Sequence, residues 1–345
     1  MQSLELLFET VTAEGDFTED GKDFEIWLES EKVCRHFPTS LTLKTERVGA
    51  PATLTGELVD IKNHTPTVGS TVRLKVDGVR MFVGFVFQTS IDKYGVMSFT
   101  AYDNLRYLKN TFSNYYPKTY KIKEVIDDIA TSFELPVGYI EDIPDQGTHL
   151  MIDNECALDV ICRLVDTAMV LTGRILVFYA DDKSHLTLRY ADDMISDVLI
   201  GDNSLATEYS LSVSIDEDTY NQIFLYRTSE GMGRRIAGTA QDDSTKLLWG
   251  PLRLTESIDD IMSEAQLTDR ADKMLAMKDR PTKSMTITAL GIVGLRAGMM
   301  INIHFPSIPD DISKKQTVIL DSVTHNFEDG NHTMTLEVHT FWRNI

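Results

Sequence analysis

The chain has few of the features that mark a disulfide scaffold, a metal site or a membrane span. It carries only three cysteines, Cys34, Cys156 and Cys162, and none stands in a Cys-x-x-Cys spacing. Cys156 and Cys162 are six apart in a predicted helix, which places them on different faces and argues against a disulfide. The first residues lack a basic segment, and the most apolar window is interrupted by glycines and Arg296. We therefore expect no export signal and no membrane insertion.

Positive charge is also scarce. The chain has 33 Lys and Arg against 53 Asp and Glu, a formal net charge of -20 at pH 7. Such a chain repels a phosphate backbone and releases no counterions on binding it, so a tight DNA or RNA ligand is not expected. The 42% of hydrophobic and 25% of charged residues are ordinary for a folded protein, and 345 residues allow two or three domains.

The sequence is rich in β-strand patterns at both ends. Short apolar and polar alternations run through the first hundred residues, and Asp77-Gly78 joins two of them as a β-hairpin turn. The run Val79–Phe87 is apolar on both faces, which predicts a central strand with Gly84 at a bulge or a close contact. Strands return after about Leu205, and the end of the chain predicts a strand and then a hairpin across Asp329-Gly330.

The middle of the chain has helical periodicity. Apolar residues at helical spacing predict helices over 121–134 and 154–173, with Asn154 as N-cap and Gly173 as C′ residue. A hairpin over 175–178 and 186–190 is expected to pack on them. A third amphipathic helix is predicted from Ser257 to Lys278. The fold class is thus α+β, mainly β: a barrel-like domain (1–104), an α+β insert (105–204) and a second barrel-like domain with one long helix (205–345).

Several segments resemble one family of proteins. Ala101–Asn110 is similar to the Tyr-Asp-x-Leu-Arg-Tyr-Leu-x-Asn segment of PBSX-prophage-type tail hubs, which are related to the T4-like tail hub. Leu295–Gly298 resembles the Leu-Arg-x-Gly turn of contractile phage tail hubs, and Ser322–Phe327 resembles their Ser-Val-x-His-x-Phe hairpin. Ser244–Leu252 matches a further segment, with Trp249 and Pro251 as departures.

The resemblance implies a structural baseplate hub of a contractile tail, with the tail-hub fold. Such a hub is a homotrimeric ring that joins the six-fold tail tube to the three-fold spike and anchors other baseplate proteins. The particle is then a phage tail or an R-type bacteriocin, assembled in the bacterial cytoplasm, with DNA only in transit. The alternative is a tail-associated cell-wall hydrolase or a carbohydrate-binding component, which would need an open groove with aromatic residues and a carboxyl of raised pKa.

No residue is predicted to be catalytic, to bind a cofactor or to bind a metal. His325, His332 and His339 flank the final hairpin, but alternation places His332 and His339 on opposite faces, so they are interpreted as ordinary strand histidines. The loop Gly231-Met-Gly233 before Arg234-Arg235 lacks the Lys-Ser/Thr ending of a phosphate loop. Adjacent acid pairs point apart and are interpreted as solvated surface: Asp127-Asp128, Asp181-Asp182, Asp242-Asp243 and Asp310-Asp311.

The Tyr102-Asp103-Asn104 segment has two readings. Asp103 or Asn104 can cap backbone N–H groups where a strand ends in a turn. Alternatively, Asp103 or Arg106 contacts a partner protein, or Arg106 beside Tyr107 is a residue of a domain joint. Neither reading implies a reaction.

Overall fold

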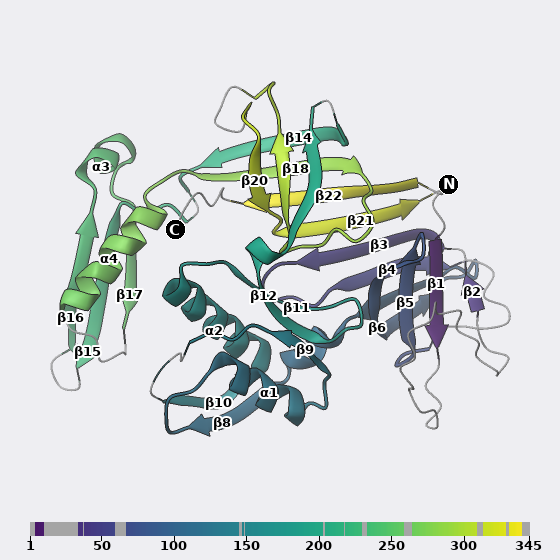
Figure 1. Ribbon diagram of the computed structural model, residues 1–345, viewed down its shortest axis with the longest axis horizontal. Helices are drawn as coiled ribbons and strands as arrows, with labels where there is room; N and C mark the ends of the chain where they lie inside the picture. Colours follow the sequence, from purple (N-terminus) through teal and green to yellow (C-terminus); the bar gives the residue numbers. More distant parts are fainter. Residues whose placement is uncertain are drawn as a thin grey trace. The chain divides into compact units, whose positions relative to one another are not determined.

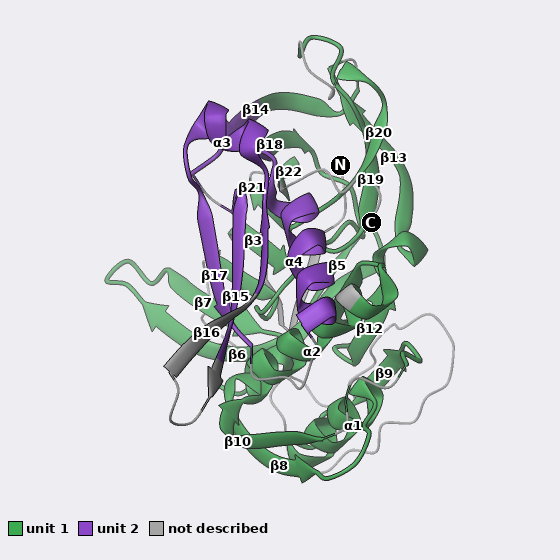
Figure 2. Cartoon of the chain, turned by 90° about the vertical axis from the view of Figure 1, so that its left-hand side faces the viewer, with its two compact units in different colours: residues 1–209, 286–345 green, residues 210–285 purple. Residues whose placement is uncertain are grey.

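A computed structural model describes twelve stretches of the chain: residues 4–9, 34–36, 38–58, 67–144, 147, 149–202, 204–216, 218–229, 233–258, 264–308, 313–328 and 331–339. The chain divides into two compact units (Figure 2). Unit 1 comprises residues 1–209 and 286–345, and unit 2 comprises residues 210–285. The predicted fold class is confirmed, because the structure is mostly β with several sheets and a helical segment.

The largest sheet joins strands from the two ends of the sequence (Figure 1). Its order is β14 (Ala206–Ser214), β18 (Thr282–Leu290), β22 (Asn331–His339), β21 (Ser322–Glu328), β3 (Pro38–Glu46), β4 (Thr53–Leu58), β7 (Met97–Tyr102), β6 (Val79–Ile91), β5 (Thr71–Val76), β1 (Leu4–Glu9) and β2 (Cys34–His36). The antiparallel pair β21–β3 connects residues about 280 positions apart, with His325 opposite Leu43.

The predicted hairpin at Asp77-Gly78 is confirmed. Strands β5 and β6 are antiparallel and pair Val76 with Val79, so these two residues form the turn. Both have positive φ, 51° at Asp77 and 78° at Gly78, as a type I′ turn requires. Strand β6 lies between β5 and β7, as predicted. At Gly84 a Cβ would lie 2.3 Å from the Tyr102 carbonyl oxygen, which confirms the predicted close contact.

Between the two sets of strands lies an α+β segment with its own core. Its elements are η1 (Asn104–Lys109, a 3₁₀ helix), β8 (Thr111–Tyr116), α1 (Ile122–Ser132), β9 (Val137–Ile140), β10 (Leu150–Cys156), α2 (Ala157–Thr172), β11 (Leu176–Ala180) and β12 (Leu186–Tyr190). The buried side chains of α1 and α2 pack with those of η1, β11 and β12 and form a cluster separate from the core of the large sheet.

Both helix predictions in this segment are confirmed, and so is the β11–β12 hairpin. Gly173 ends α2 in the left-handed region with φ of 66°. The predicted N-cap is wrong: α2 begins after Cys156, and Asn154 belongs to strand β10. The helix starts later than predicted because strand β10 pairs with β8 as far as Cys156, which lies opposite Thr111.

A three-stranded sheet completes unit 1. It contains β13 (Ile195–Gly201), which follows the short η2 helix (Ala191–Asp193), then β19 (Met300–His304) and β20 (Gln316–Ile319). The predicted C-terminal strand and hairpin correspond to β19 and to the β21–β22 pair. Asp329-Gly330 lies outside the described residues.

Unit 2 is a three-stranded sheet with a helix packed on it. The sheet order is β16 (Gly233–Gln241), β15 (Gln222–Ser229) and β17 (Arg253–Ser257), with α3 (Asp243–Trp249) between β16 and β17 and α4 (Glu264–Lys278) after β17. Leu267 and Ala271 of α4 pack against Ile223 and Leu225 of β15. The predicted start of the helix at Ser257 is wrong, because Ser257 extends β17 beside Tyr226. Ile261 and Met262 lie outside the described residues.

The predicted domain boundaries after residues 104 and 204 stay a prediction, and the compact units follow a different division. Strands from the first and last thirds of the chain share one sheet, so they fall in one unit. Residues 210–285 have a core of their own and form the other.

Candidate functional site, a buried polar junction in unit 1

Three segments singled out from the sequence meet in unit 1. They are Tyr102–Asn110, Leu295–Gly298 and Ser322–Phe327, and each is tied to the rest of the unit by buried polar contacts. We call this set of contacts the junction. It joins the large sheet, the turn between β11 and β12, and the loop before β19.

Asp103 is a buried carboxylate that caps two backbone groups. Its Oδ1 accepts the Leu105 N–H at 3.0 Å, and its Oδ2 accepts the Ala52 N–H at 3.1 Å. The predicted capping role is therefore confirmed, with Asp103 as N-cap of η1. Burial raises the pKa of Asp103 to about 7, and the two backbone N–H donors and the charge of Arg296 oppose this rise.

Asn104 connects the same segment to the β11–β12 turn. Its backbone N–H donates to Ser184 Oγ at 3.0 Å, and its Nδ2 donates to the Ser184 carbonyl oxygen at 2.7 Å. Leu105 and Leu108 are buried in the core of the α+β segment. The buried residues of η1 thus attach the α+β segment to the end of strand β7.

Arg296 is the half-buried cation of the junction. Its Nη1 donates to the Ala180 carbonyl oxygen at 2.6 Å, and its guanidinium carbon lies 4.0 Å from the centroid of the Tyr179 ring. Burial lowers the pKa of Arg296, while the charges of Tyr179, Asp103 and other nearby acids oppose the shift. The next residue, Ala297, donates its N–H to Thr45 Oγ1 at 3.0 Å. The Leu295–Gly298 turn therefore binds both the insert and strand β3.

A buried pair of histidines holds the same turn from the C-terminal hairpin. His325 Nε2 lies 2.7 Å from the Leu295 carbonyl oxygen, and His325 Nδ1 lies 2.9 Å from His332 Nε2. Because a carbonyl only accepts, Nε2 of His325 carries the proton and Nδ1 accepts from His332. The ring of Phe327 stacks on that of His332 with centroids 4.3 Å apart. Burial lowers the pKa of His325 to about 4 and also lowers the pKa of His332.

The other candidate groups do not gather into one site. Asp181 accepts the N–H groups of Lys183 and His185 in a turn, and Asp242 caps α3. Asp128 accepts the Tyr116 hydroxyl at 2.8 Å. Asp310-Asp311 and residues 231–232 of the glycine loop lie outside the described residues. Among the residues that the structure describes, no group of three or more His, Cys, Asp or Glu could hold a metal ion.

Sequence reasoning missed the roles of Arg296, Ser184 and Thr45. A signal existed only for Arg296, a lone cation in the apolar stretch from Gly291 to Phe305. In the sequence Ser184 is an ordinary turn residue and Thr45 an ordinary strand residue. Their contacts join positions 80 and 252 residues apart, which no local pattern encodes.

None of the described helices has the length and apolar character needed to span a membrane. The fold of the chain is similar to that of solved phage tail proteins. The structure aligns with a prophage MuSo2 43 kDa tail protein from Shewanella oneidensis with a TM-score of 0.69, 11% identity, and coverage of 97% of this chain and 98% of that one. A tail protein from Neisseria meningitidis MC58 gives a TM-score of 0.66 at 13% identity, covering 98% and 96%.

The chain belongs to the YQBQ-like family, whose model matches residues 41–339. It is 30% identical over 305 residues to the phage-like element PBSX protein XkdQ of Bacillus subtilis, covering 87% of this chain and 91% of that protein. The resemblance to PBSX-prophage-type tail proteins is thus confirmed. A third structure, the Escherichia coli c3393 protein, is described as a type VI secretion component similar to the T4 tail proteins gp27 and gp5; it aligns with a TM-score of 0.52 at 10% identity, covering 90% of this chain and 76% of that one.

Proposed function

We propose that the chain is the structural baseplate hub of a contractile tail. The observation that carries the proposal is the likeness in fold along nearly the whole chain to prophage tail proteins, together with membership of the family of XkdQ. In this role three copies form a ring between the six-fold tail tube and the three-fold spike, and the ring anchors other baseplate proteins. The two strand-rich ends, 1–104 and 205–345, act as the two barrel-like domains, and 105–204 lies outside them.

The chemistry of the junction supports a structural role. Asp103 and His325 are buried, Arg296 is half-buried, and all three are bonded to backbone groups of other elements. A catalytic acid or base must instead reach a substrate. We therefore infer that these groups fix the geometry of unit 1 and that the chain has no catalytic turnover and needs no metal.

The charge of the chain fits a channel that DNA crosses without binding. A charge of -20 per chain becomes roughly -60 in a ring of three, and this repels phosphate. The hub then belongs to the tail of a phage or of an R-type bacteriocin, since both need the same ring.

Light scattering of the purified chain tests the ring, and zymography on peptidoglycan tests the alternative of a cell-wall hydrolase. We expect three times the mass of one chain, capture of tail tube and spike proteins, and no clearing of the peptidoglycan gel. A lytic band, or stoichiometric zinc or iron after chelator treatment, would contradict the structural role.

A further inference from the structure

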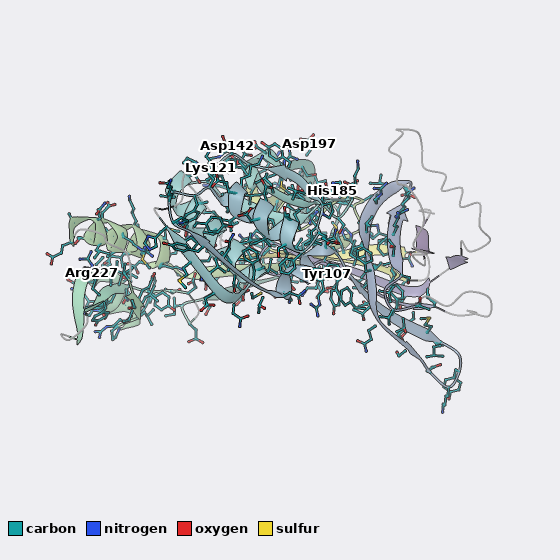
Figure 3. All side chains as sticks on the ribbon, turned by 90° about the horizontal axis from the view of Figure 1, so that it is seen from below. Tyr107, Lys121, Asp142, His185, Asp197 and Arg227 are labelled. Atoms are coloured by element: carbon teal, nitrogen blue, oxygen red, sulfur yellow. The ribbon has the colours of Figure 1, made fainter. Side chains whose placement is uncertain are left out.

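The Tyr102–Lys109 segment has an outer side that the junction does not use. Asp103, Asn104, Leu105 and Leu108 are buried. Tyr102, Arg106 and Tyr107 are only half-buried, and Lys109 at the end of the segment is exposed. In Figure 3 Tyr107 lies on the side of unit 1 away from the ion pair of Lys121 and Asp142.

These side chains form an aromatic patch with Phe85 and Phe87 of strand β6. The ring centroids of Phe85 and Tyr107 are 5.9 Å apart, those of Phe87 and Tyr107 5.7 Å, and those of Phe87 and Tyr102 5.4 Å. The guanidinium carbon of Arg106 lies 5.2 Å from the Phe87 centroid and 6.0 Å from that of Tyr102. We use "aromatic patch" for these five residues.

Strand β6 explains why the patch is apolar. Its inner face, with Phe82 and Val86, is buried in the core of the large sheet. Its outer face carries Phe85 and Phe87, which remain half-exposed. A strand that is apolar on both faces is normally covered on both faces. Within the described residues, however, only one face of β6 is fully covered. Aromatic residues and arginine are also the residue types most enriched at protein interfaces.

Arg106 shows what kind of partner the patch would accept. Among the described residues its guanidinium makes no hydrogen bond and no ion pair, whereas Arg163 and Arg174 pair with Glu155 and Asp192 at 2.7 and 2.8 Å. The rings hold the guanidinium in place while its N–H donors stay available. A planar fork fixed in this way matches a carboxylate.

We propose that the aromatic patch docks a carboxylate-bearing surface of a second copy of this chain. The proposal deepens, and rests on, the trimeric hub proposed above. Copies that each carry a charge of -20 repel one another, so a stable contact must place cations of one copy against carboxylates of the next. A ring of three closes through heterologous contacts. In such a contact the patch of one copy meets a different surface of the next copy, so the Arg106 side chains of two copies do not face each other.

Sedimentation of the full chain over a concentration series, at low and at high salt, tests the proposal. We expect Arg106→Ala to weaken each of the three interfaces of the ring by about 30-fold, the effect of losing one hot spot per interface. Arg106→Lys keeps the charge but loses the planar fork, so an intermediate effect is expected. The matched control is Arg189→Ala, because Arg189 is exposed and lies 5.2 Å from the Tyr139 centroid in a similar arrangement outside the patch.

The outcomes separate this proposal from the proposed function. A wild-type trimer that Arg106→Ala leaves equally tight overturns the docking surface and leaves the hub standing. Equal weakening by Arg106→Ala and Arg189→Ala also overturns it, since the effect then follows net charge. A wild-type chain that stays monomeric at every concentration overturns both. Circular dichroism of each variant verifies that it is folded. If Arg106→Ala is not folded, the effect of Arg106→Lys on trimer dissociation tests the docking surface instead.

Discussion

Acid is expected to release the C-terminal hairpin through His325. In the folded chain His325 donates to the Leu295 carbonyl oxygen and accepts from His332. A proton added to His325 Nδ1 turns that acceptor into a donor, so two N–H groups face each other across 2.9 Å. Asp77 is the acid whose charge acts on His332, and it opposes the fall in that pKa. The substitution that removes the titration is His325→Gln, whose amide can still donate to Leu295.

The size of the effect follows from the pKa of His325. Its folded value is about 4 and its ordinary value is 6.5. Between these values the unfolded chain binds a proton that the folded chain does not, so unfolding takes up a proton and the free energy of unfolding falls as the pH falls. At about 1.4 kcal/mol per pKa unit, wild type loses about 3 kcal/mol relative to His325→Gln between pH 7 and pH 4. Asp103 titrates in an overlapping range, but both chains retain it and it cancels in the difference.

Hydrogen exchange of peptides from β21 and β22 measures this loss locally. After correction for the intrinsic pH dependence of exchange, we expect protection of these strands to fall more steeply with acid in wild type than in His325→Gln. His304→Gln is the control, because His304 is exposed on β19. Parallel pH profiles for wild type and His325→Gln would refute the reasoning, as would an equal change in His304→Gln.

Three further substitutions test the junction and the sheet, each by the midpoint of urea unfolding. Arg296→Met leaves the Ala180 carbonyl oxygen without the Arg296 donor and should lower the free energy of unfolding by about 3 kcal/mol. The loss should be larger above pH 7, where Asp103 is ionised, and an unchanged midpoint would contradict this. For Asp103→Asn, wild type should lose about 3 kcal/mol of stability relative to the variant as the pH rises from 4 to 7. The reason is that the folded pKa of Asp103 is about 7 and the unfolded value is 3.8; a flat difference would exclude the raised pKa. Gly84→Ala places a Cβ 2.3 Å from the Tyr102 carbonyl oxygen, so a loss of about 1–3 kcal/mol is expected, and a neutral result would mean that β6 and β7 shift freely.

Local chemistry explains what the sequence could predict. The Asp77-Gly78 hairpin, the α1 and α2 periodicities and the Gly173 cap depend on residues a few positions apart, and each agrees with the structure. The capping role of Asp103 was predictable for the same reason, since its cap of Leu105 is two residues away. Its second acceptor contact, to Ala52, is 51 residues away and was not.

Long-range pairing explains what the sequence could not predict. Alternation gives the face of each histidine on its own strand, but contact between His325 and His332 depends on the hairpin register. Phe327 lies opposite His332 and His325 lies opposite Met334, so the two histidines are diagonal neighbours on one face. The prediction of where α4 starts was wrong for another reason. Ile258 has the apolar character of the helical pattern, yet it lies just beyond β17 and its N–H donates to the Tyr226 carbonyl oxygen.

Asp103 links the junction to the aromatic patch. Two N–H donors from separate elements, Ala52 and Leu105, converge on it, and only a carboxylate offers two acceptor oxygens with no competing donor. An apolar residue would avoid the cost of burying a charge, but it would leave both donors without an acceptor. The Arg106 N–H also bonds the Asp103 carbonyl oxygen, which fixes the turn that directs the Arg106 side chain over Phe87. Residue 103 thus holds the start of the short helix through its side chain and fixes the turn before Arg106 through its backbone carbonyl.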